Sequence, residues 1–161
     1  MDDREIVERQ IGRRPRALLR VVARCPWGRP AVTEQAPFDE HGEPFPTTYY
    51  LTCPQLVAAL ARVEAAGGVD RWTRAVEGDA ELGASLAAAN DEQRAVRRGL
   101  AGGRDGPGLD RGVGGSSRTG SLKCLHAHAA FALARPGYEL GERILAEVTP
   151  LWPQERCCTD L

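Results

Sequence analysis

The stretch Phe45-Pro46-Thr47-Thr48-Tyr49-Tyr50-Leu51-Thr52-Cys53-Pro54 marks the point at which strand patterns give way to helix patterns. Its β-branched and aromatic residues predict a strand over 45–52, because such side chains suit a pleated surface. Within this strand, Tyr49 and Tyr50 point to opposite faces. Pro54 fits the first position of a helix, where its missing N–H would have no partner in any case. The stretch therefore predicts that a small sheet ends here and that a run of helices begins.

Two more strands are expected upstream of this junction. Residues 17–24 are rich in leucine and valine, and residues 30–36 can return beside them after a tight turn at Cys25-Pro26-Trp27-Gly28. Before them, apolar residues at helical spacing predict a short helix over 2–11. The economical assembly of the three strands is one antiparallel sheet.

Five further stretches have the apolar spacing of helices, and the longest follows Asp79, a residue type that suits an N-cap. The five helices are predicted at 54–66, 69–77, 79–100, 122–134 and 138–148. We therefore predict an α+β fold, in which a small antiparallel sheet of about three strands, from the N-terminal third, packs against about five helices. The domain is expected to span 1–149, with a glycine-rich loop or linker at 101–120, ordered or disordered, and a flexible tail at 150–161.

The size and charge of the chain narrow the classes of function. Its 161 residues fit one domain, and its net charge of -1 gives no support to nucleic-acid binding. The N-terminus lacks the apolar core of a signal peptide, and no apolar run reaches the roughly 18 residues that a membrane span needs. We therefore expect a cytoplasmic protein that does not engage a membrane, with its five cysteines reduced.

Three of the cysteines occupy positions where free backbone N–H groups can point at sulfur. Cys25 begins a turn, Cys53 precedes a helix, and Cys124 lies at or near the start of another helix. Such N–H groups stabilise a thiolate, which is the form of cysteine that binds metal or attacks an electrophile. Cys124 belongs to the stretch Lys123-Cys124-Leu125-His126-Ala127-His128, which adds imidazole, and thiolate with imidazole is a ligand set that zinc accepts.

Helix geometry decides which histidine can join Cys124. At about 100° per residue, Cys124 and His128 lie about 40° apart on one helix face, whereas Cys124 and His126 lie about 200° apart. His128 is the better partner if Cys124 is inside the helix, and His126 becomes reachable if the helix begins after Cys124. The predicted metal site is therefore Cys25, Cys53 and Cys124 with His128 or His126, with zinc favoured and an iron–sulfur cluster as the alternative.

These cysteines have alternative roles that the sequence leaves open. They can be buried apolar residues of the core, and no Cys-Xaa-Xaa-Cys pair, the stronger zinc signature, occurs. A catalytic cysteine, an open-coordination zinc or an iron–sulfur centre would make the protein an enzyme. The vicinal pair Cys157-Cys158 is interpreted as incidental, and the basic link Arg13 to Arg16 as a solvated connector or an anion-binding patch.

A regular stripe of mostly apolar residues over 82–100 offers a docking face for a protein partner. Arg94, Arg97 and Arg98 lie off this stripe and are expected to be solvated. Scattered acidic residues such as Glu64 are expected on helix surfaces.

Three motifs of the chain stand out together. They are Arg24-Cys25-Pro26 with Gly28 and Pro30, the stretch over 45–54, and Lys123-Cys124-Leu125-His126. In these motifs the chain resembles an actinobacterial family of unknown function, numbered 501 among such families, to about Ala134. The loop from Gly102 to Gly120 departs from the family pattern. The family has no established activity, but its genes often lie near those of a septum-formation protein and an exopolyphosphatase-like enzyme. The resemblance thus implies, as an alternative function, an adaptor in cell division or phosphate metabolism.

Overall fold

The sheet contains three antiparallel strands in the order β1 (Leu18–Arg24), β2 (Pro30–Gln35) and β3 (Tyr49–Leu51). The structure is a computed structural model that describes residues 1–118 and 120–160. Every residue of the central strand β2 is buried. On this strand, Val32 pairs with Leu51 of β3. The predicted three-stranded antiparallel sheet is confirmed.

Six α-helices lie in the described residues, rather than about five, and the predicted α+β class is confirmed. They are α1 (Asp3–Ile11), α2 (Pro54–Ala65), α3 (Gly68–Gly78), α4 (Ala80–Ala101), α5 (Leu125–Ala134) and α6 (Glu139–Glu147). Two short 3₁₀ segments are η1 (Val113–Gly115) and η2 (Cys158–Asp160). The Asp79 carboxylate caps α4 by accepting from the N–H of Glu81 at 2.9 Å. No helix in this part of the chain is long and apolar enough to cross a membrane.

The third strand is shorter than the predicted 45–52. The carbonyl oxygen of Thr48 still accepts from the N–H of Gln35 in β2 at 2.7 Å, and residues 45–48 also bind side chains of α4. Arg97 donates to the carbonyl oxygen of Phe45 at 2.9 Å and to the Thr48 hydroxyl at 3.1 Å. Gln93 donates to the same hydroxyl at 2.9 Å. The expectation that Arg97 is solvated is therefore wrong, since its side chain is completely buried.

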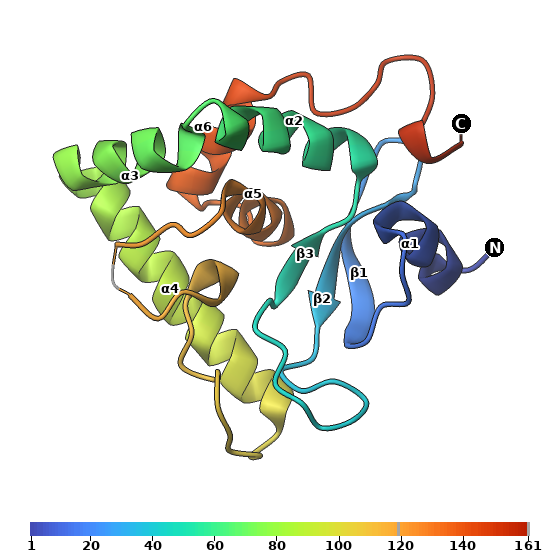
Figure 1. The fold of residues 1–161 in the computed structure, drawn as a ribbon, viewed down its shortest axis with the longest axis horizontal. Coiled ribbons are helices and arrows are strands. Elements are labelled where there is room, and N and C mark those ends of the chain that lie inside the picture. Colours follow the sequence, from blue (N-terminus) through green and yellow to red (C-terminus); the bar gives the residue numbers. More distant parts are fainter. Residues whose placement is uncertain (119, 161) are drawn as a thin grey trace.

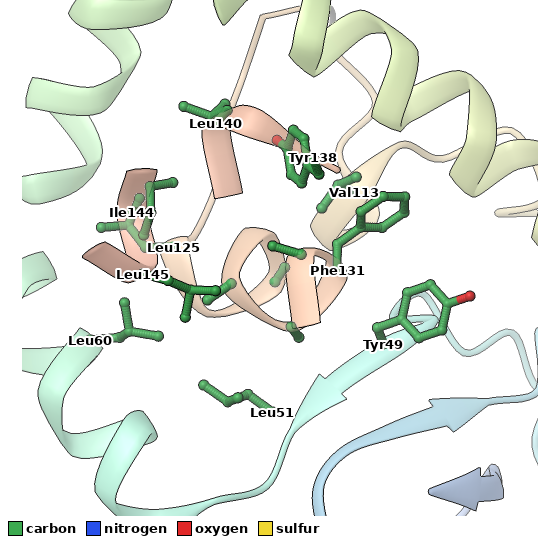
Figure 2. Packing of buried hydrophobic residues seen from close by; sticks show 14 of the residues in the cluster. Tyr49, Leu51, Leu60, Val113, Leu125, Phe131, Tyr138, Leu140, Ile144 and Leu145 are labelled. Atoms are coloured by element: carbon green, nitrogen blue, oxygen red, sulfur yellow. The ribbon is translucent and has the colours of Figure 1, made fainter. Parts of the chain in front are cut away.

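Helix α5 lies at the centre of the fold, among β3, α2 and α6 (Figure 1). Most of its residues are buried, and four of the buried ones are alanines, which let neighbouring elements approach closely. The rings of Tyr49, Phe131 and Tyr138 stack edge to face around it, with centroid distances of 5.6 Å and 5.3 Å (Figure 2). The core is therefore organised around the helix that follows the Lys123–His128 motif.

The stripe predicted on the long helix packs inside the chain. Leu82, Leu86, Ala89 and Gln93 are all buried. A protein partner at this helix stays a prediction, and it would have to contact a different face of α4.

The glycine-rich loop predicted at 101–120 packs against α4 in its described part. Leu109 and Val113 are buried, and the N–H of Val113 donates to the Asn90 side-chain oxygen at 3.0 Å. Arg97 donates to the carbonyl oxygen of Gly108 at 3.0 Å. Buried side chains and hydrogen bonds therefore attach the described part of this loop to α4.

The C-terminal segment, predicted as a flexible tail at 150–161, runs back past α2 toward the N-terminal third in its described residues (Figure 1). Trp152 is partly buried against the core, and Cys157 is only 3 % exposed. The Thr159 hydroxyl accepts from the Gln10 side chain of α1 at 3.0 Å. The segment therefore places the last two cysteines beside the N-terminal third of the chain.

Candidate functional site

Cys25 begins the turn that joins β1 to β2. Its carbonyl oxygen accepts from the N–H of Gly28 at 2.9 Å, and Gly28 adopts the positive φ of 77° that closes the turn. Burial raises the pKa of the Cys25 thiol. The N–H groups of Trp27 and Arg29 point at its sulfur and lower this pKa, as free amides in a turn are expected to do.

Cys53 is the N-cap of α2, and Pro54 occupies the first helical position as predicted. Burial raises the pKa of Cys53 to about 11, while the N–H groups of Leu56 and Gln55 oppose this increase. Each of these two cysteines thus combines a desolvated sulfur with backbone donors. That environment disfavours a free thiolate but suits a thiolate whose charge a bound cation neutralises.

The C-terminal segment places a second cysteine beside each of these two. The Sγ atoms of Cys25 and Cys157 lie 3.8 Å apart, and those of Cys53 and Cys158 also lie 3.8 Å apart. The N–H of Thr159 donates to the Cys157 sulfur at 3.4 Å. All four are free thiols. The interpretation of Cys157-Cys158 as incidental missed these contacts, because the paired residues are 132 and 105 positions apart in the sequence.

Cys124 lies in a different environment. It is the N-cap of α5, so the helix begins after it, and this is the geometry in which His126 was expected to be reachable. Cys124 and His126 line one cavity of about 330 Å³, together with Thr47 and Tyr49. Burial raises the pKa of Cys124. The preceding Lys123 has a φ of 63°, which is uncommon for a residue other than glycine.

His126 is fixed by two acceptors of α2. Its Nδ1 lies 3.0 Å from Glu64 Oε1, and its Nε2 lies 3.0 Å from the carbonyl oxygen of Val57. Both ring nitrogens of His126 therefore face acceptors of α2, and metal binding by either one would require displacing Glu64 or the Val57 carbonyl. The second carboxylate oxygen of Glu64 accepts from the N–H of Leu125 at 2.7 Å. Glu64, expected as a scattered surface residue, thus joins α2 to the start of α5.

His128 is a hydrogen-bonded core residue. Its side chain is completely buried, with Nδ1 2.7 Å from the Tyr138 hydroxyl and Nε2 2.9 Å from the carbonyl oxygen of Leu122. Because a carbonyl only accepts, Nε2 carries the proton and Nδ1 accepts from the hydroxyl. Both nitrogens are therefore occupied, and metal binding by His128 would require breaking one of these bonds.

The predicted site residues fall into separate places. In the described part of the chain, no group of three or more His, Cys, Asp or Glu side chains is placed to hold a metal ion. Cys25 and Cys53 face the C-terminal segment, while Cys124 and His126 share the cavity beside β3. A shared site of Cys25, Cys53 and Cys124 stays a prediction, and the geometry associates two of its members with the last two cysteines instead.

The chain belongs to the family described as "Protein of unknown function (DUF501)", which matches residues 21–146. The matched range contains Cys25, Cys53 and Cys124, and it ends before Cys157 and Cys158. No curated protein matches the chain. No solved structure matches it either.

Proposed function

We propose that this protein is a metal-binding domain in which Cys25, Cys53, Cys157 and Cys158 bind one zinc ion. The ion would fasten the C-terminal segment to the N-terminal sheet. The observation that carries the proposal is the pair of equal Sγ–Sγ distances, 3.8 Å in each case. The proposal keeps the predicted ligands Cys25 and Cys53 and replaces Cys124 and the histidines by the two cysteines that follow the family match.

The sulfur spacing matches tetrahedral zinc. With Zn–S bonds of about 2.3 Å, two sulfurs of a tetrahedral site lie about 3.8 Å apart. Sulfur atoms in van der Waals contact have a similar separation, so a zinc site and two packed thiols share this distance. The repeat of this spacing in two neighbouring pairs, and the N–H groups that act on Cys25 and Cys53, favour the metal.

Binding one ion requires the two cysteine pairs to approach each other. Cys157 and Cys158 are adjacent in the chain, so one shift of the C-terminal segment moves one cysteine of each pair. We place the protein in the cytoplasm, where thiols stay reduced and available to zinc. Binding would release the thiol protons, and the ion would be the charge partner of the desolvated thiolates that form.

The test is the zinc content of the full-length protein purified under reducing conditions without added metal. We expect about one zinc per chain in the wild type and in the matched control Cys124→Ser, and less than about 0.2 in Cys25→Ser and Cys157→Ser. Because a variant can lose zinc by misfolding, cobalt(II) titration of the refolded wild type provides a second measurement. We expect the cobalt(II) form to show the thiolate-to-cobalt charge-transfer absorption of a site with four thiolate ligands.

Three results would overturn the proposal. The first is less than about 0.1 zinc per chain in the wild type together with unchanged stability in chelator. The second is full zinc content in Cys157→Ser. The third is a disulfide between Cys25 and Cys157 in the mass spectrum of protein purified under reducing conditions. A brown protein after anaerobic purification would replace zinc by an iron–sulfur cluster, which is the predicted alternative.

A further inference from the structure

A second site lies on the other side of the sheet from α5. A cavity of about 120 Å³ is enclosed by α1, the basic link that follows it, β2 and β3. One water molecule needs only about 10–15 Å³ of such space, so the cavity admits a ligand of several heavy atoms. It shares no lining residue with the cysteine pairs.

Three arginines line this cavity, and one of them has no acidic partner among the described residues. Arg14 pairs with Glu40 at 3.1 Å, and Arg16 pairs with Asp39 at 3.5 Å. Arg13 forms no ion pair within the described residues, and its guanidinium donates to the Tyr50 hydroxyl at 3.2 Å. The cavity therefore has one positive charge that no carboxylate balances, at a position where a ligand can reach it.

The floor of the cavity is polar although it belongs to the central strand. Thr33 and Gln35 are 0 % and 4 % exposed, and the Gln35 amide nitrogen donates to the Thr33 hydroxyl at 2.6 Å. This bond uses one N–H of the amide and leaves the second N–H for a ligand. The Tyr50 hydroxyl accepts from Arg13, so its own proton is likewise available. Tyr49 points into the core and Tyr50 lines this cavity, in agreement with their predicted opposite faces.

The donors define the ligand. A guanidinium, a hydroxyl and an amide N–H around one cavity suit an anion with three oxygens in a tetrahedral arrangement, whereas a planar carboxylate is satisfied by the guanidinium fork alone. Val7, Ile11 and Phe45 form the apolar part of the wall. A small hydrocarbon group attached to the anion would fill this part and gain contact area.

We infer that this cavity is a binding site for a small phosphate monoester. Arg13, Tyr50 and Gln35 hold the phosphate oxygens, and the apolar wall holds the substituent. Arg14 and Arg16 are neutralised by their own carboxylates, so Arg13 supplies the charge that attracts the phosphate.

The test is calorimetric titration of the full-length protein with phenyl phosphate, inorganic phosphate and benzoate. Phenyl phosphate is expected to bind more tightly than either of the other two. Arg13→Gln should weaken phenyl phosphate binding about ten- to a hundredfold, because it removes a charge-assisted contact. Arg9→Gln is the matched control: it removes the same charge from an exposed position of α1 outside the cavity, and it should change the affinity less than about twofold. Tyr50→Phe, which removes one oxygen, should weaken binding by a smaller factor than Arg13→Gln.

Arg13 is exposed, so its replacement leaves the fold intact, and thermal unfolding of each variant verifies this. Equal affinities of Arg13→Gln and Arg9→Gln would overturn the assignment of the cation. Benzoate binding as tightly as phenyl phosphate would overturn the choice of phosphate over carboxylate. Inorganic phosphate binding as tightly as phenyl phosphate would overturn the role of the apolar wall, and the absence of saturable binding would overturn the site.

Discussion

The buried imidazole of His128 predicts that the protein loses stability in mild acid. Its neutral form satisfies both neighbours, since Nε2 donates to Leu122 and Nδ1 accepts from Tyr138. Burial lowers the pKa of His128 from 6.5 to about 4, and the hydrogen bond to the Leu122 carbonyl opposes this only in part. His128 is therefore protonated at a lower pH in the folded protein than in the unfolded chain.

The sign and size of the effect follow from these two pKa values. Well above pH 6.5 neither state binds the proton, so the full stability is present. As the pH falls from 6.5 toward 4, mainly the unfolded state is protonated and stability is lost, by about 3 kcal/mol in total. Between pH 7.5 and pH 5.0 the loss from this one group is about 2 kcal/mol.

Urea unfolding followed by circular dichroism at pH 7.5 and pH 5.0 measures this loss. His128→Gln keeps a side chain that can donate and accept hydrogen bonds but cannot titrate. Its pH-dependent loss should be smaller than that of the wild type by about 2 kcal/mol. His41→Gln is the matched control, because His41 is exposed, and it should behave as the wild type. Equal losses in the wild type and His128→Gln would refute the reasoning, since other groups would then cause the acid sensitivity.

Three further substitutions test the packing by urea unfolding. Arg97→Met should lower the free energy of unfolding by about 3 kcal/mol or more, because buried carbonyl oxygens lose their donor, and Arg97→Lys should lose less. A loss below about 1 kcal/mol in Arg97→Met would contradict this. Gly141→Ala should cost about 1–3 kcal/mol, because the new Cβ would lie 2.7 Å from the Ala132 side chain, whereas Gly99→Ala meets no atom within 4 Å and should stabilise. Asp79→Ala should lose about 1 kcal/mol through its N-cap, and an unchanged midpoint would contradict that role.

Local sequence signals predicted most of the elements correctly. Pro54 marks the first position of α2, and Asp79 caps α4. Each of these signals depends on a few neighbouring residues, so it can be recognised before the fold is known. The two possible starts of α5 were also defined by local geometry, and the structure selects the one in which Cys124 precedes the helix.

Long-range contacts account for what the sequence did not predict. Arg97 lies off the apolar stripe of its helix, and its acceptor Phe45 is 52 positions away, so no local pattern predicts its burial. The same holds for Cys157 and Cys158, whose partners come from the first third of the chain. A cysteine pair in a C-terminal segment becomes informative only once the path of that segment is known.

Strand β2 explains why the cavity beneath α1 is better understood as a binding site than as imperfect packing. Its Val32 faces the core with Leu51, whereas Thr33 and Gln35 face the cavity. Buried polar side chains weaken a strand unless they are hydrogen-bonded, and one face of a central strand needs only apolar residues to pack against a helix. Gln10 of α1 donates to the carbonyl oxygen of Pro30 at the start of the same strand and also to the C-terminal segment. Fastening that segment through its cysteines would therefore hold α1, and with it one wall of the cavity, against the polar face of β2.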